Sequence, residues 1–100
     1  MDMYRIDSTI LDLPFTGLTI KKSPTTSGIE ILCISLEKGA AFPEHSSPKD
    51  ARLIVVQGNI EFNIANQTFQ LSAQQSLSFP KEEIHSVKAN EDSKFLIIRS

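Results

Sequence analysis

Turn-forming residues recur along this chain at intervals too short for a helical protein. Prolines, glycines and asparagines interrupt the sequence repeatedly from Pro14 to Asn90, and the runs between them are rich in Ile, Val, Leu, Phe and Thr. This spacing is typical of an antiparallel β-sandwich or barrel, so we predict an all-β fold. The expected strands are Leu18–Ser23, Ile29–Leu36, Arg52–Gln57, Asn59–Ile64, Thr68–Leu71, Ser76–Phe79, His85–Lys88 and Phe95–Arg99.

The N-terminal segment lacks the pattern of a helix. Met1–Leu13 carries no sustained series of apolar residues three or four positions apart. We therefore expect residues 1–16 to form an irregular or strand-like arm. No stretch has the composition of a linker, and 100 residues are enough for one core, so residues 1–100 are expected to form a single domain.

Two of the expected strands differ from the others in being apolar on both faces. Asn59–Ile64 alternates polar and apolar residues, as a strand with one solvated face does. In contrast, Ile29–Ile34 and Leu53–Val56 offer apolar side chains to both sides. Such strands are expected to be covered by the barrel interior and by another sheet or subunit. We therefore predict a symmetric homodimer, whose interface contains Ile54, Val56 and part of the N-terminal arm.

Charge and composition exclude several classes of function. The net charge is −2, and the Lys and Arg residues are scattered, so a nucleic-acid partner is not expected. No apolar run is long enough to span a bilayer, and no membrane role is expected. The N-terminus is acidic from Asp2 and lacks the features of a secretory signal, so a cytoplasmic location is expected. The single cysteine, Cys33, is interpreted as a small core residue.

A pattern of spaced residues in the first half of the chain carries the most specific information. Gly39 is followed after five residues by His45, then by Ser47, Ala51 and Gly58. This spacing resembles the first motif of the cupin family, which reads G, five residues, H-x-H, three or four residues, E, six residues, G. Ser47 stands in place of the second histidine, and Ala51 stands in place of the glutamate.

The second half of the chain contains a matching block. The second cupin motif reads G, five residues, P-x-G, two residues, H, three residues, N. The corresponding positions are Gln74, Pro80, Glu82, His85 and Ala89, so only the proline and the histidine match. The resemblance covers residues 29–100 and implies a small cupin-type barrel, also described as a double-stranded β-helix or jelly roll.

Family resemblance implies a metal site, but most of its ligands are replaced. Cupins typically hold a divalent ion with three histidines and one glutamate, and only His45 and His85 match. Two imidazoles without a carboxylate are few ligands for Zn, Fe, Ni or Mn. Asp50 would face inward only if a bulge near Pro48 turned it. Ser47 is a poor metal ligand and a fair hydrogen-bond partner for an organic ligand.

The remaining candidates are interpreted as structural. Phe42, Phe62 and Phe79 are expected to pack in the barrel wall or mouth. Arg52 is expected to face outward, with an anion-binding role as its alternative.

Three hypotheses for function follow from these residues. The first is a non-catalytic module that binds or senses a small molecule through His45, Ser47 and His85. The second is a metal-dependent enzyme of the isomerase, dioxygenase or hydrolase type that uses His45 and His85. The third is a structural or partner-binding barrel with a packed interior. We adopt the first, with no cofactor expected.

Overall fold

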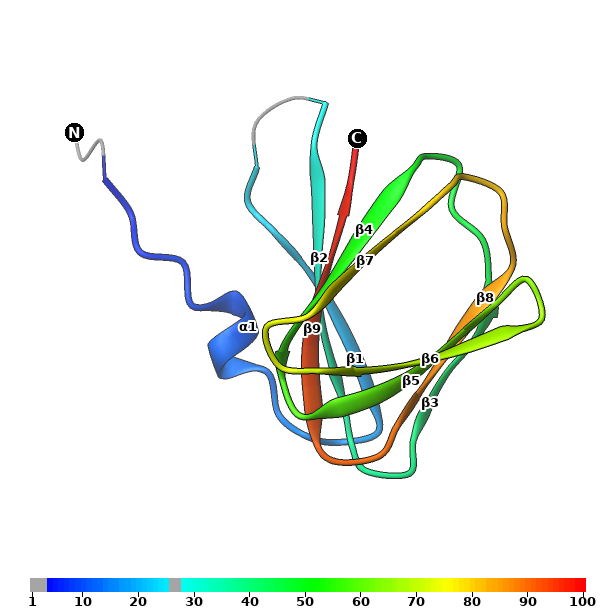
Figure 1. The fold of residues 1–100 in the computed structure, drawn as a ribbon. Helices are drawn as coiled ribbons and strands as arrows, with labels where there is room; N and C mark the ends of the chain where they lie inside the picture. The colour runs from blue at the N-terminus through cyan, green and yellow to red at the C-terminus, as the bar shows by residue number, and fades with distance from the viewer. Residues whose placement is uncertain (1–3, 26–27) are drawn as a thin grey trace.

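The computed structural model of the protein describes residues 4–25 and 28–100, which contain one short helix and nine strands (Figure 1). No helix in these residues has both the length and the apolar character needed to cross a membrane. The elements are α1 (Thr9–Asp12), β1 (Leu18–Ser23), β2 (Glu30–Leu36), β3 (Ala41–His45), β4 (Ala51–Gln57), β5 (Asn59–Ile64), β6 (Gln67–Ser72), β7 (Ser76–Phe79), β8 (His85–Ala89) and β9 (Ser93–Arg99).

The strands form two antiparallel sheets that face each other. One sheet has the order β1-β2-β9-β4-β7, and the other has the order β3-β8-β5-β6. The predicted all-β antiparallel sandwich is therefore confirmed. The expected strands are present with shifts of one or two residues at some ends, the largest at the start of β9, which begins at Ser93 instead of Phe95.

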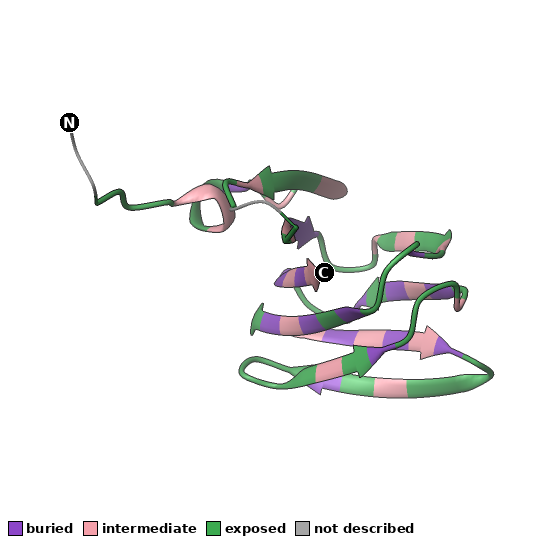
Figure 2. Cartoon of the chain, turned by 90° about the horizontal axis from the view of Figure 1, so that it is seen from above, coloured by how far each residue is buried: buried purple, intermediate pink, exposed green. Residues whose placement is uncertain are grey.

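The core lies between the inward faces of the two sheets. Ile60, Phe62 and Ile64 of β5 are buried, and the polar residues between them are partly exposed, which confirms the predicted alternation. Figure 2 shows the same alternation of buried and exposed positions along other strands. Phe62 and Phe95, one from each sheet, are fully buried.

The outer face of β2 is also covered. We expected another sheet or subunit there, but the N-terminal arm covers it instead. Cys33 and Ser35 are 2% and 0% exposed, although they alternate with the core residue Ile34. The N-terminal arm lies over this face, where Ser35 Oγ donates a hydrogen bond of 2.8 Å to the Pro14 carbonyl. Burial raises the pKa of the Cys33 thiol, in agreement with its interpretation as a small buried residue.

Lys94 connects the arm to β9, the strand next to β2. Lys94 of β9 is 7% exposed, its Nζ donates to the Leu11 carbonyl at 2.8 Å, and it lies 5.0 Å from the centre of the Phe15 ring. Leu13 of the arm is itself buried. The arm thus supplies the second layer that the apolar composition of β2 requires.

The conformation predicted for the arm is wrong at one turn. Thr9–Asp12 is helical instead of irregular or strand-like, although the helix has only four residues. Asp7 organises this turn by accepting hydrogen bonds from Thr9 Oγ1 at 2.6 Å and Ser23 Oγ at 2.7 Å. These bonds lower the pKa of the Asp7 carboxyl. Local side-chain bonding of this kind is not visible as apolar periodicity. Residues 1–3 of the predicted arm lie outside the described residues.

The prediction also omits strand β3, because Pro43 resembles a turn residue in the sequence. β3 is the edge strand of its sheet, where a missing backbone N–H does not interrupt a central ladder. Its pairing with β8 contains a β-bulge between Phe42 and His45.

The outer face of β4 remains partly open. Ile54 is half-buried and Val56 is 46% exposed. Ile6 of the arm is 97% exposed, and the beginning of the arm, before α1, extends away from the sheets (Figures 1 and 2). The homodimer stays a prediction.

Gly58 joins β4 to β5 at a point where no larger residue fits, which gives the first testable prediction. Its φ is +89°, and an added Cβ would lie 2.5 Å from the Asp92 carbonyl oxygen and 2.8 Å from Ser93 Cα. We expect Gly58→Ala to lower the free energy of unfolding by about 2–5 kcal/mol, through left-handed strain and overpacking together.

Gly39 provides the matched control for this substitution. Its φ is +85°, but an added Cβ would meet nothing within 4 Å. Gly39→Ala should therefore cost only the strain of about 1–2 kcal/mol. Urea denaturation of both variants measures the difference, and equal losses would contradict the steric argument.

Candidate functional site

The two histidines come together as partners on adjacent strands. His45 ends β3, His85 begins β8, and the pairing of the two strands places them opposite each other. The centres of their rings are 4.1 Å apart, with an angle of 67° between the ring planes. The β-bulge in β3 lets Phe42 and His45 face the interior together, because it adds one residue to the usual alternation.

These histidines line a partly open cavity of about 270 Å³. We call it the histidine cavity. Its lining consists of Leu32, Phe42, His45, Ser47, Phe79, His85, Ile97 and Arg99. The structure therefore places the three predicted binding residues around one space, together with Arg99, which the sequence analysis did not select. That these residues bind a ligand stays a prediction.

Aromatic side chains surround the imidazoles. Phe42 stacks on His45 with ring centres 4.0 Å apart, and Phe79 lies 4.6 Å from His85. Phe62 contacts His85 from the core side at 5.6 Å. The three phenylalanines thus pack in the wall, as predicted, and they also form the apolar surroundings of the histidines.

Backbone hydrogen bonds fix which ring nitrogen carries the proton. His45 Nδ1 lies 2.8 Å from the Pro43 carbonyl oxygen, and His85 Nδ1 lies 2.9 Å from the Glu83 carbonyl oxygen. Since a carbonyl oxygen can only accept, each Nδ1 must donate. In the neutral ring, Nε2 is then an acceptor with a free lone pair.

Burial determines the charge state of His85. Its side chain is 2% exposed, and desolvation lowers the pKa of the imidazole, with small further lowering by the positive charges of His45 and Arg99. The hydrogen bond to Glu83 acts in the opposite direction and is the weaker effect. His85 is therefore neutral at pH 7, with its Nε2 available as an acceptor.

Ser47 holds the loop before β4 in place. Its Oγ donates to the Lys49 carbonyl at 2.9 Å and accepts from the Lys49 N–H at 3.2 Å. Its carbonyl accepts a hydrogen bond of 2.7 Å from the Glu82 N–H, which joins this loop to the loop before β8. Because the hydroxyl proton is already used, Ser47 offers the cavity only acceptor capacity.

The position corresponding to the family glutamate carries no ligand. Ala51 is buried and faces the core beside Leu53, while Asp50 is exposed and accepts from the Lys81 N–H at 2.9 Å. The alternative in which a bulge turns Asp50 inward is therefore wrong. The bulge lies in β3 instead.

This set of residues does not fit a divalent metal ion. Within residues 4–25 and 28–100, no three His, Cys, Asp or Glu side chains are grouped closely enough to hold one. The lining supplies two imidazole acceptors and no carboxylate, and it includes the permanently charged guanidinium of Arg99. A guanidinium repels a nearby cation, which weighs against a divalent ion in this cavity on electrostatic grounds.

Arg99 and Glu30 form part of a charged group at the mouth of the cavity. Arg99 Nη2 forms an ion pair with the Glu30 carboxylate, and Lys22 Nζ lies 2.9 Å from its other oxygen. The hydrogen bond from Lys22 is the main cause of a lowered pKa for Glu30, and the charge of Arg99 adds to it. Glu30 is therefore ionised at neutral pH.

Arg52 faces outward as expected. It is exposed on β4, next in sequence to the buried Ala51, and its Nε donates to Ser78 Oγ at 3.1 Å. The alternative role of Arg52 as an anchor in the interior is therefore wrong for this structure. The arginine that lines the cavity is Arg99.

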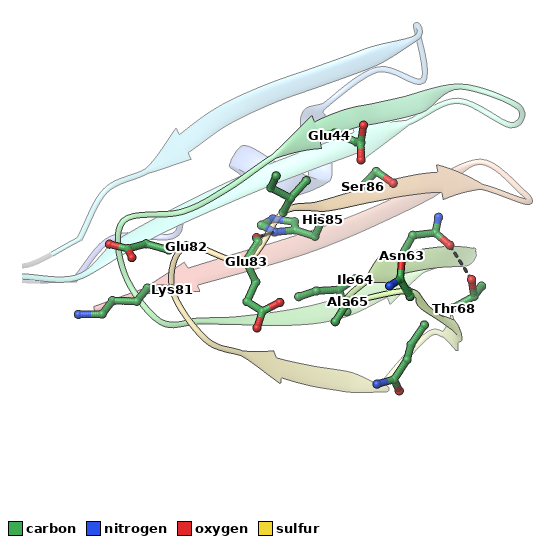
Figure 3. Close-up of a pocket in the computed structure, with 13 residues that line it drawn as sticks. Glu44, Asn63, Ile64, Ala65, Thr68, Lys81, Glu82, Glu83, His85 and Ser86 are labelled. Carbon is green, nitrogen blue, oxygen red and sulfur yellow. Dashed lines mark hydrogen bonds between the residues drawn. The ribbon is translucent and has the colours of Figure 1, made fainter.

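A second hollow lies between the β5–β6 turn and the loop before β8. It is wider, at about 780 Å³, and open to solvent. Figure 3 shows its polar side chains spread along these segments, where Asn63 accepts a hydrogen bond from Thr68 at 2.8 Å. His85 lines this hollow as well, but the other polar side chains of the hollow lie apart from one another in Figure 3. The histidine cavity, where both histidines meet Arg99, is therefore the stronger candidate site.

The sequence comparisons agree with this fold. Residues 33–99 match the family described as Cupin domain. No curated protein sequence matches the chain.

Several solved structures resemble the protein. SPY1581 from Streptococcus pyogenes, a conserved protein of unknown function, has a TM-score of 0.81 and 23% identity, covering 99% of this chain and 88% of that one. The cupin superfamily protein DSY2733 from Desulfitobacterium hafniense has a TM-score of 0.83 and 17% identity, covering 99% and 93%. KdgF from Halomonas sp. has a TM-score of 0.74 and 24% identity, covering 82% and 76%. At these identities the similarity concerns the fold.

The lowered pKa of His85 gives a prediction for pH dependence. The unfolded chain binds a proton near the ordinary histidine pKa of about 6.5, while the folded protein resists protonation until lower pH. The free energy of unfolding should therefore be fully retained above pH 6.5 and fall as the pH decreases below it. Urea denaturation at pH 7.5 and pH 5 measures this loss, which should be smaller in His85→Gln. An equal loss in the variant would show that His85 is not responsible.

Proposed function

Because the chain belongs to the family of cupin domains, we propose that it is a non-catalytic module that binds or senses a small molecule in the histidine cavity. The observation that carries this proposal is the convergence of His45, His85 and Arg99 on one cavity. The volume of about 270 Å³ lies just below the usual range of about 300–1,000 Å³ for small-molecule sites, so the ligand must be small.

The chemistry of the lining supports a binding role. Each histidine has a backbone partner for Nδ1 and a free acceptor at Nε2, so both are held in a defined orientation. Apolar walls around a few oriented polar groups are the usual composition of a small-molecule site. A ligand with one or two polar groups and a compact carbon skeleton matches this arrangement.

A screen of small metabolites by thermal shift tests the proposal. A ligand that binds only the folded state raises the melting temperature by mass action. Binding measured by calorimetry should weaken in His45→Ala and in His85→Ala, each by about 1–3 kcal/mol, because a buried hydrogen-bond partner is lost.

Asn63→Ala is the matched control, since Asn63 lines the open hollow instead of the histidine cavity. Binding should be unchanged in this variant. The proposal is rejected if no compound in the screen stabilises the protein. It is also rejected if the compounds that bind do so with unchanged affinity in both His45→Ala and His85→Ala. In that case the structural or partner-binding barrel becomes the leading hypothesis.

The runner-up is a metal-dependent enzyme that uses His45 and His85. We expect well below one transition-metal ion per chain in protein purified without chelators or an affinity tag, because two neutral ligands beside a guanidinium bind a cation weakly. Elemental analysis measures the content. One equivalent of Zn, Fe, Ni or Mn that disappears in His45→Ala would favour the enzyme over the binding module.

A further inference from the structure

Arg99 is the charged side chain in the lining of the histidine cavity. It follows Phe95 and Ile97 at two-residue intervals in β9, so it points to the same face of the sheet as these core residues. Its cross-strand partners are Glu30 and Ala51, and its side chain is 19% exposed. The small side chain of Ala51 leaves room for the guanidinium on that side.

The guanidinium is incompletely bonded. Nη2 pairs with Glu30, and Nη1 reaches Ser47 Oγ only at 3.4 Å, beyond the usual range for an N–H···O bond. Nε is buried and finds no hydrogen-bond partner among residues 4–25 and 28–100. Buried donors in native proteins are nearly always bonded, so the guanidinium has unused capacity. Because Nε itself is closed off from solvent, Nη1, whose contact with Ser47 is long, is the donor that points to an acceptor supplied from outside the chain.

The charges around Arg99 favour an anion. Lys22 and Arg99 contribute two positive charges and Glu30 contributes one negative charge, which leaves one positive charge in excess at this end of the cavity. The neighbouring apolar walls strengthen the attraction for an anion, because they exclude water. A carboxylate is the planar group that matches the donors of a guanidinium.

The histidines require a different group on the same ligand. Their Nδ1 atoms donate to backbone carbonyls, so each Nε2 needs a donor from the ligand. A hydroxyl supplies such a donor without adding positive charge. An ammonium group would also donate, but it would be repelled by Arg99.

We propose that the ligand of the histidine cavity is a small hydroxycarboxylate, whose carboxylate is bound by Arg99 and whose hydroxyl donates to the Nε2 of a histidine. This inference rests on the proposed binding function and names the chemical class of its ligand. The four apolar residues of the lining would contact the carbon skeleton, and these are Leu32, Phe42, Phe79 and Ile97.

A series of related probes separates the groups of the ligand. Mandelate carries the carboxylate and the hydroxyl, mandelamide lacks the charge, and phenylacetate lacks the hydroxyl; lactate, lactamide and propionate form a smaller parallel series. Titration calorimetry at low ionic strength should rank each hydroxycarboxylate above both of its analogues, by about tenfold or more over the amide. Added salt should reduce this preference.

Three variants assign the carboxylate to Arg99. Arg99→Gln should weaken mandelate binding by about tenfold or more and bring it near that of mandelamide. Glu30→Gln should act in the opposite direction, because it releases Nη2 and removes the competing carboxylate. Arg52→Gln is the matched control, since Arg52 is exposed on the outer face of the sheet. The affinity of this variant for mandelate should equal that of the wild type.

Each outcome decides the inference. Equal binding of acids and amides, the absence of binding by every acid probe, or unchanged affinity in Arg99→Gln would overturn the carboxylate assignment. The proposed function would survive these results if uncharged compounds still bind in a manner that depends on His45 and His85. Circular dichroism verifies that Arg99→Gln is folded, and a failure of Glu30→Gln to tighten binding would count against the assignment independently.

Discussion

The antiparallel pairing of β9 with both β2 and β4 fixes the interior of this protein. Phe95 and Ile97 fill the core between the sheets, and the same alternation carries Arg99 to the mouth of the cavity. A slip of one residue in this pairing would turn all three side chains to the outer face. The register that builds the core therefore also determines the charge of the site.

Charge distinguishes this cavity from the metal site that the sequence motifs imply. The motif glutamate corresponds to Ala51, and the cross-strand neighbour of Ala51 is Arg99. The position at which the family motif has an anionic metal ligand therefore carries no charge here. The positively charged guanidinium of Arg99 lies beside it. The two histidines remain, and because backbone carbonyls hold both Nδ1 atoms, their Nε2 atoms suit a hydrogen-bonding ligand as well as a metal. Arg99 decides between these possibilities on electrostatic grounds.

Much of the fold could be predicted from the sequence, because turn spacing and strand alternation are local features. The motif spacing also selected His45 and His85, which the structure brings side by side. Strand β3 was missed since its proline is tolerated only at a sheet edge, and an edge position is a property of the assembled sheet. The bulge that turns His45 inward depends on the same pairing.

Arg99 was missed for a related reason. Its two-residue spacing from Phe95 and Ile97 was a usable signal, since it places the arginine on an apolar face. What the sequence could not supply was the neighbour on β4 that leaves room for the guanidinium, or the pairing with Glu30 that occupies Nη2. These facts depend on register between strands far apart in the chain.

Nitrogen NMR of the side chains tests the central claim most directly, since it identifies which hollow a ligand enters. In protein labelled with ¹⁵N, addition of mandelate should shift the guanidinium signals of Arg99 and the Nε2 signal of His45. Both residues line the histidine cavity and not the open hollow, whereas His85 lines both. The side-chain amide signals of Asn63 and Gln67, which line the open hollow, should stay in place. Shifts confined to those amides and to His85, with the Arg99 and His45 signals unchanged, would contradict the account.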